Sequence, residues 1–482
     1  MNKSYQINSV LETVYTTINT FLAHIIAFVS IIIFARFLPL SDFGLYFVLF
    51  AIATFFNEFA HGIGIGLKKR VSEFRKGKLA YIILSTVIWA GYSVLIASTF
   101  VLIELTTSVF SLTTMEIFGF VLFFTGRGFY LLFHEALSGL GKPSLAEKVR
   151  IFLHSGKLLL QGSLLVAGYG LTGILVGGAV GYFLAVLILC LNILREPIMF
   201  HSRLQSTFDD LLTFSKWSVL SRFTDSFNYQ VLLIIIFLVI SVDDVGIVES
   251  AMRVAAVSSI FAFSVRRALV PKISAIDDVN EPIESITTNI YKYVSLVIPP
   301  VIIGGILLGP DLLVFVYGSD FTVVTRLIFI SSLVYMAVQS YRIVNDGILY
   351  GIDTPDTVFK INVLTGGLLV IILVPVAFFS KNTVLIIVSA VFIETIRVVL
   401  QYYALSEQIK IPFRKVYSTV SLQVVAATVM GVILYVMEYI TSLDDVLKTP
   451  IFVGIGAVIY ATLIYSFDSE LKQNVHSFFS DN

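Results

Sequence analysis

The sequence has few charged residues, almost no cysteine and no net charge. Only 13% of its 482 residues are charged, whereas a soluble domain carries roughly 25%. The single cysteine, Cys190, excludes a disulfide within the chain and a zinc cluster. The net charge of zero excludes the basic surface of a nucleic-acid-binding protein. We find no Walker, nucleophile-elbow or HExxH motif and only scattered histidines, so we expect no cofactor, no metal and no enzymatic activity.

Long hydrophobic runs dominate the chain instead. Hydrophobic residues make up 57% of the sequence, and the mean hydropathy is +0.92. A helix needs roughly 20 apolar residues to cross a bilayer, and about fourteen segments reach this length. The sequence therefore predicts an all-α polytopic membrane protein with about fourteen transmembrane helices.

The stretch from Ala35 to Glu73 indicates the orientation. Its apolar run over residues 43–66 is followed by a basic cluster that extends from Lys68 to Lys78. Cytoplasmic loops carry an excess of lysine and arginine, so this end of the helix is expected inside the cell. The loops predicted on the opposite side are mostly acidic. We therefore expect a multi-pass protein of the cytoplasmic membrane with both termini in the cytoplasm.

Three short similarities, in the same order along the chain, indicate an internal repeat. The first two pairs are about 202 residues apart and the third about 212 residues apart, as a repeat requires. The pairs are Asp42–Tyr46 with Asp244–Val248, Arg70–Glu73 with Lys272–Ala275, and Leu137–Pro143 with Leu349–Pro355. Each copy holds an even number of predicted spans, so the copies run in the same direction as a parallel repeat.

This repeat suggests a domain division. We expect a six-helix N-lobe over residues 1–194 and a six-helix C-lobe over residues 217–407. The irregular segment over residues 195–216 is expected to be a cytoplasmic linker between the lobes. Residues 408–482 have no counterpart in the repeat and are expected to form two additional helices and a cytoplasmic tail.

Charged residues inside the predicted spans are the most informative. Each costs roughly 2.5–3.5 kcal/mol at a helix centre, so we expect all of them to face protein, water or a ligand. Many share a helix face with an opposite charge three or four residues away. These pairs are Arg222 with Asp225, Glu249 with Arg253, Arg342 with Asp346, and Glu394 with Arg397. Structural ion pairing and coupling of transport to an ion both remain open for them and for Glu58.

The fifth predicted helix carries a different pattern. Arg150, His154, Lys157 and Gln161 are spaced four, three and four residues apart, which places them on one stripe of the helix. Arg127 on the preceding helix also lacks an acid three or four residues away. Snorkelling of these cations, or pairing with Glu58, would be a structural explanation. We favour a cationic wall that lines a central cavity and binds an anionic group, either phosphate or carboxylate.

Several segments resemble one known family. ARFLPLSDFGLYFVLFAIATF and GIGIGLKKRVSEF, at residues 35–55 and 62–74, are similar to the opening of the polysaccharide-biosynthesis oligosaccharide-lipid flippases (Wzx-like). DVGIVESAMRVAAV and LVPKIS resemble the second lobe of that family, and ILYGIDTPDTVFKINVL resembles its tenth-to-eleventh helix connection. These flippases belong to the multidrug/oligosaccharidyl-lipid/polysaccharide (MOP) exporter superfamily, together with the multidrug and toxin extruders (MATE) and the lipid II flippases.

The resemblance implies two six-helix lobes around a central cavity, with two extra helices in this chain. It implies translocation of a polyprenyl- or dolichol-linked oligosaccharide by alternating access, with membrane lipid and glycan-assembly enzymes as partners. Family members often line the cavity with basic residues, and Arg127, Arg150, Lys157 and Arg253 lie where such residues could sit. Lipid II flippases carry arginines in the first helix, where this chain offers only His24.

Three functions are compatible with these patterns. The first is a flippase for lipid-linked oligosaccharides in cell-surface polysaccharide synthesis or protein glycosylation. The second is an ion-coupled small-molecule antiporter of the MATE type, which the cationic stripe disfavours because its substrates are commonly cations. The third is a membrane-embedded glycosyltransferase, which would need larger outer loops with catalytic carboxylates than this sequence has.

Overall fold

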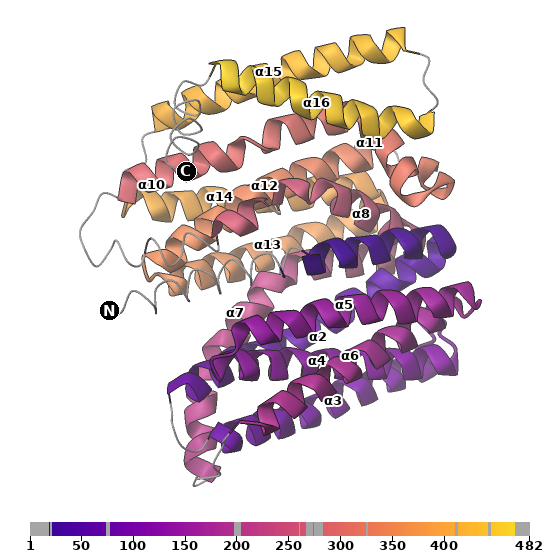
Figure 1. Ribbon diagram of the computed structural model, residues 1–482, viewed down its shortest axis with the longest axis vertical. Coiled ribbons are helices and arrows are strands. Elements are labelled where there is room, and N and C mark those ends of the chain that lie inside the picture. Colours follow the sequence, from indigo (N-terminus) through magenta and orange to yellow (C-terminus); the bar gives the residue numbers. More distant parts are fainter. Residues whose placement is uncertain are drawn as a thin grey trace. The chain divides into compact units, whose positions relative to one another are not determined.

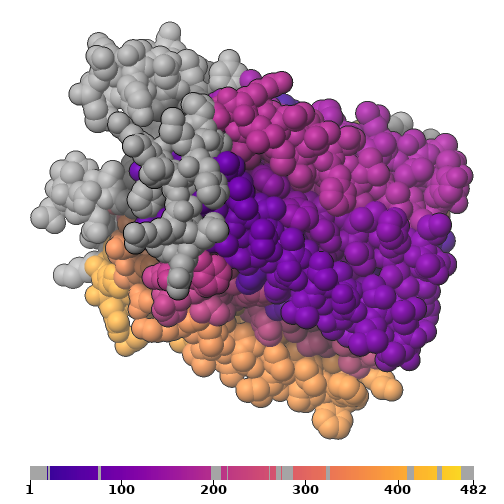
Figure 2. All heavy atoms as spheres, turned by 90° about the horizontal axis from the view of Figure 1, so that it is seen from below, coloured from indigo at the N-terminus to yellow at the C-terminus, as the bar shows by residue number. Residues whose placement is uncertain are grey.

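The computed structural model of the chain is all-helical in the part that it describes. The described residues are 19, 22–73, 78–196, 204–259, 261–266, 273, 283–323, 326–409, 413–441 and 445–467. They form two compact units, Met1–Ile234 and Ile235–Asn482, which we treat separately. Figure 1 shows the helices in sequence colours, and Figure 2 shows that side chains fill the spaces between the ribbons of each unit.

The first unit begins with a helix over Leu22–Phe37. Its further helices are α2 (Leu40–Glu73), α3 (Lys78–Thr107), α4 (Thr114–Gly139), α5 (Pro143–Val166), α6 (Gly170–Leu194) and most of α7 (Leu204–Val239). Within this unit α4 packs against α2, α3, α5 and α6, and α5 packs against α6. The helix α4 is therefore the centre of the unit.

The second unit begins with α8 (Val242–Ala255) and a helix over Val257–Arg266, which are bent by 42° relative to each other. Its further elements are α10 (Ile283–Ser295), α11 (Ile298–Tyr317), a short 3-10 helix (Ser319–Val323), α12 (Arg326–Gly351), α13 (Pro355–Ser380), α14 (Thr383–Ser406), α15 (Phe413–Ile440) and α16 (Asp445–Phe467). Here α12 packs against α8, α11, α13 and α14, so it has the central place that α4 has in the first unit.

The described helices confirm a polytopic membrane protein. Eleven of them are long and apolar enough to span a bilayer, and the bent pair in the second unit would make twelve. Two further expected spans fall outside this number: α5, whose polar stripe lowers its hydropathy, and Leu22–Phe37, which is shorter than a full span. The count of about fourteen helices stays a prediction.

Matching details in the two units support the internal repeat. Proline lies in the first turn of both α5 and α13, where the missing N–H has no partner to lose. In the second unit, the Asp244 carboxylate accepts a 2.7 Å hydrogen bond from Thr383 at the start of α14. In the first unit, the Asp42 carboxylate faces Gly170 at the start of α6. Asp42 and Asp244 are separated by the first offset found in the sequence. The starts of the two helices that they face, α6 and α14, are separated by about the second offset.

One apolar span of the second unit is broken between α10 and α11. Pro299–Pro300 supplies no N–H groups there, so the carbonyl of Leu296 loses its usual helical partner. The hydroxyl of Tyr460 on α16 donates to that carbonyl at 2.8 Å. The amide of Gln423 on α15 donates to the carbonyl of Lys292 at 3.0 Å. The two additional helices therefore satisfy backbone groups that would be costly to expose to lipid.

The segment predicted as a linker is partly helical. Residues 197–203, which include Arg203, lie outside the described part, and α7 starts at Leu204 and continues past residue 216. The boundary between the two units falls inside α7, after Ile234, and not in the segment 195–216. We expected an irregular segment because its polar residues and Pro197 resemble a loop, but the polar residues after Leu204 lie on a helix.

Contacts between α7 and the rest of the first unit explain this helix. Asp210 forms a 2.7 Å ion pair with Arg70 on α2 and accepts a 2.8 Å hydrogen bond from Tyr81 on α3. Further along α7, the backbone of Val219 lies so close to Gly62 that a Cβ there would come within 2.5 Å of its Cα. The polar start of α7 is thus held by the first unit through specific side-chain contacts.

Candidate functional site

The first unit gathers five basic or imidazole side chains from three helices. His154 on α5 interacts electrostatically with Lys157, Arg150, His24 and Arg127. Arg150, His154 and Lys157 lie on one stripe of α5, Arg127 comes from α4, and His24 comes from the first helix. We call these five residues the cationic group. The sequence predicted four of its members, and His24 joins them in the structure.

Lys157 is the most buried member of the cationic group. Its side chain is 9% exposed, and its Nζ lies 3.4 Å from the hydroxyl of Tyr182 on α6. The same Nζ lies 4.5 Å from the centre of the Tyr182 ring. Within the described residues no carboxylate forms an ion pair with Lys157. The suggested pair with Glu58 is not formed, because Glu58 binds Arg222 at 2.8 Å and His61 at 3.6 Å.

Arg127 is held in place by neutral groups. Its guanidinium donates a 2.6 Å hydrogen bond to Thr54 on α2 and lies 4.6 Å from the centre of the Phe50 ring. Among the described residues no carboxylate forms an ion pair with it. Arg127 and Lys157 therefore keep positive charges that the described part of the protein does not neutralise directly.

Arg150 differs from Arg127 and Lys157, because it forms an ion pair with a carboxylate, that of Glu147 one turn earlier on α5. Glu147 also lies 3.6 Å from His134 on α4, and His134 lies 3.7 Å from Glu135. Glu135 in turn binds Lys68 on α2 at 3.2 Å. A chain of charged side chains and the imidazole of His134 thus connects Arg150 to the basic end of α2. The sequence showed these residues but not their contacts, which join three separate helices.

Gln161 does not fit the predicted cavity wall. It is 1% exposed, and its amide donates a 2.8 Å hydrogen bond to the carbonyl of Ile174 on α6. Gly177 and Gly178 lie against it so closely that a Cβ at either position would come within about 3 Å of Gln161. Gln161 therefore fastens α5 to α6. The last residue of the predicted stripe thus packs inside the unit, and the cavity wall formed by the other three stays a prediction.

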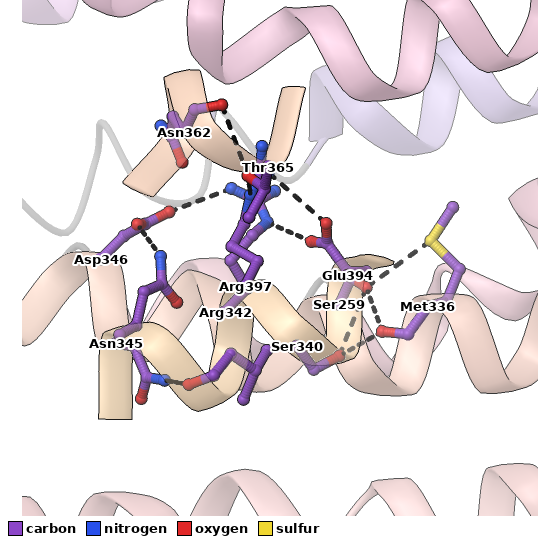
Figure 3. Close-up of polar contacts among 12 residues, drawn as sticks. Ser259, Met336, Ser340, Arg342, Asn345, Asp346, Asn362, Thr365, Glu394 and Arg397 are labelled. Carbon is purple, nitrogen blue, oxygen red and sulfur yellow. Dashed lines mark hydrogen bonds and ion pairs between the residues drawn. The ribbon is translucent and has the colours of Figure 1, made fainter. Parts of the chain in front are cut away.

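The second unit contains a buried network of charges (Figure 3). Arg342 on α12 binds Glu394 on α14 at 2.6 Å and Asp346 at 3.0 Å. Arg397 lies 3.5 Å from the same Glu394 and donates a 2.9 Å hydrogen bond to Thr365 on α13. All four charged side chains are less than 9% exposed. Figure 3 shows the two arginines side by side, with the carboxylates on either side of them.

Polar neighbours extend this network. Gln401 donates a 2.7 Å hydrogen bond to Asp346, and Tyr291 on α10 donates a 2.5 Å hydrogen bond to Asn345. Arg266 lies 3.8 Å from Asp346, so a second guanidinium besides that of Arg342 approaches this carboxylate. The network joins α12, α13 and α14 through charges that are paired inside the unit.

The remaining predicted site residues also have partners. Arg253, predicted to line the cavity, binds Glu249 on its own helix at 2.5 Å. Arg222 forms a 2.8 Å ion pair with Glu58 on α2, and its expected pairing with Asp225 stays a prediction. The described residues contain no group of histidine, cysteine and acidic side chains that could hold a metal ion.

These helices, which expose many apolar side chains and bury several charged ones, define a polytopic membrane protein. The chain belongs to the family described as polysaccharide biosynthesis protein, whose model matches residues 33–326. It is 24% identical over 255 residues to the probable low-salt glycan biosynthesis flippase Agl15 of Haloferax volcanii. That match covers 52% of this chain and 53% of the relative, so the chain spans about half the length of the curated relatives it matches.

Solved structures confirm the fold class. The lipid II flippase MurJ in an inward closed conformation has a TM-score of 0.78 and 14% sequence identity, over 95% of this chain and 99% of that chain. An inward-facing multidrug resistance MATE family transporter of the MOP superfamily has a TM-score of 0.63 and 13% identity, over 80% of this chain and 96% of that chain. At these identities the likeness concerns the fold alone.

Proposed function

We propose that this protein is a flippase that moves a polyprenyl- or dolichol-linked oligosaccharide across the cytoplasmic membrane by alternating access. The cationic group of the first unit carries this proposal, because it concentrates positive charge inside membrane helices. Phosphate is an anion that arginine and lysine bind well, and it is the charged part of such a lipid carrier. The family match and the flippase relative support the same substrate class.

In this proposal Arg127 and Lys157 bind the phosphate or pyrophosphate, since neither forms an ion pair with a described carboxylate. Arg150 extends the positive surface along α5, and the imidazole of His154 lies on the same stripe. The network around Glu394 holds α12, α13 and α14 together within the second unit, and the Glu249–Arg253 pair lies within α8. The protein carries out no covalent chemistry, and membrane lipid and the enzymes that assemble the glycan are its partners.

A deletion strain tests the proposed function. We expect lipid-linked glycan to accumulate on the inner face of the membrane, because the carrier cannot cross without the protein. Re-expression of the chain should remove the accumulated glycan. The alternative, a MATE-type antiporter, is supported by the likeness to multidrug transporters in fold. A strain with normal glycan export and altered drug tolerance would establish that alternative and refute the flippase.

The orientation can be tested separately. We propose that both termini lie in the cytoplasm, from the basic loops of the sequence. A reporter that is active only inside the cell should be active when fused after residue 482. The same reporter fused in the loop around Ser111 should be inactive, because that loop joins α3 and α4 on the opposite side. An external signal from the C-terminal fusion would contradict this orientation.

A further inference from the structure

The ammonium group of Lys157 presents an energetic problem. Lys157 is 9% exposed, and no described carboxylate pairs with it. A buried charge without a partner is expensive, so the ammonium needs neighbouring groups that stabilise its positive charge. Since the proposed function needs a positive charge at this position, the surroundings of the ammonium decide whether the site works.

Two aromatic rings surround this ammonium. Its Nζ lies 4.5 Å from the centre of the Tyr182 ring and 5.5 Å from the centre of the Phe123 ring. Both distances are within the roughly 6 Å over which a ring face attracts a cation. The ring quadrupole favours the charged form of lysine without neutralising it, whereas a carboxylate would cancel its attraction for a phosphate.

The rings are themselves fixed in place. Tyr182 lies edge-to-face against Phe123, with ring centres 5.3 Å apart, and it lies 5.9 Å from Tyr130. Gly181 leaves room for the lysine stem, since a Cβ there would come within 2.6 Å of the Lys157 Cγ. Tyr182 also interacts electrostatically with Arg127, the other cation that lacks a described carboxylate partner.

We propose that Tyr182 is the positioning residue of the phosphate site: its ring face holds the Lys157 ammonium in place to bind a phosphate. This inference rests on the proposed function. The ring face is the main contact, because the hydroxyl is 3.4 Å from Nζ and so contributes only a weak hydrogen bond. A phenylalanine at position 182 should therefore fulfil the role of Tyr182, whereas a leucine should not.

Binding of two matched probes to the purified full-length protein tests this role. Geranylgeranyl pyrophosphate carries a polyprenyl tail and the charged group, and geranylgeraniol carries the tail alone. We expect Tyr182→Leu to weaken binding of the pyrophosphate about 10- to 30-fold, the range for loss of a desolvated cation–π contact, and to leave binding of the alcohol unchanged. Tyr182→Phe should bind both probes within about threefold of the native protein, because an aromatic face is kept.

Tyr169→Leu is the matched control, because Tyr169 lies at the start of the same helix and is 60% exposed. Equal losses for both probes in Tyr182→Leu would indicate a purely structural role and overturn the inference. So would a Tyr182→Leu protein that binds the pyrophosphate normally. If Lys157→Ala also binds the pyrophosphate normally, then the proposed phosphate site is wrong as well.

A second measurement covers the case in which Tyr182→Leu does not accumulate. Lys157→Ala removes the ammonium but keeps both rings, so the vacated space should accept a small alkylammonium ion. Propylammonium should then restore part of the pyrophosphate binding lost in Lys157→Ala. Neutral propanol of similar size should not restore it. Failure of propylammonium to restore binding would overturn the role of the rings.

Discussion

Replacing Lys157 with alanine is expected to abolish glycan export from cells that still carry the protein in the membrane. The side chain is buried, and its charge is not neutralised by a described carboxylate, so it is available to a phosphate. Truncating one partner of a buried charge pair costs roughly 2–5 kcal/mol, which corresponds to a loss of at least about 30-fold. Export is measured as lipid-linked glycan that reaches the outer face.

Lys157→Arg should retain part of the activity, because it keeps the charge and changes the geometry. Lys360→Ala is a suitable control, since Lys360 is exposed on α13 and pairs with Asp356 at 2.9 Å. This control should export normally, because exposed ion pairs contribute little to stability. A Lys157→Ala protein that reaches the membrane and exports at the native rate would refute the phosphate site.

Replacing Glu394 with alanine is expected to destabilise the second unit severely. Glu394 is 1% exposed and lies 2.6 Å from Arg342 and 3.5 Å from Arg397. Its removal leaves buried guanidinium charge without compensation, which costs roughly 3–5 kcal/mol in buried pairs of this kind. The midpoint of thermal unfolding of the purified protein should fall, and less protein should accumulate in the membrane.

A double variant separates lost charge balance from lost packing. Glu394→Leu with Arg397→Leu removes one charge of each sign and keeps apolar volume, so it should be more stable than Glu394→Leu alone. Asp356→Asn is the control, because that carboxylate is exposed and its pair with Lys360 contributes little to stability. A Glu394→Leu protein as stable as the native one would show that the network does not support the unit.

The sequence predicted contacts between neighbouring residues of one helix better than contacts between residues far apart in the chain. The spacing of Glu249 with Arg253 and of Arg342 with Asp346 places each pair on one helix face, and both pairs form. The contact of Arg222 with Glu58 joins residues far apart in sequence, and no periodicity indicates it. For the same reason the sequence could not show which residues surround the stripe on α5.

Tyr182 shows most clearly what the sequence could not reveal. A tyrosine in an apolar helix carries no signal that distinguishes a lipid-facing ring from one that holds a cation. Only the packing of α5 against α6 brings it to Lys157. Gln161 illustrates the opposite error, because a polar residue on the predicted face turned out to bind a backbone carbonyl inside the unit.

The broken span between α10 and α11 has a consequence for synthesis of the protein. The groups on α15 and α16 that donate to carbonyls at this break, Gln423 and Tyr460, lie 131 and 164 residues further along the chain than Lys292 and Leu296. Until the ribosome has made α15 and α16, these two hydrogen-bond donors do not yet exist. The second unit therefore completes its folding only near the end of translation, and a chain that stops before α15 leaves an earlier helix unfinished.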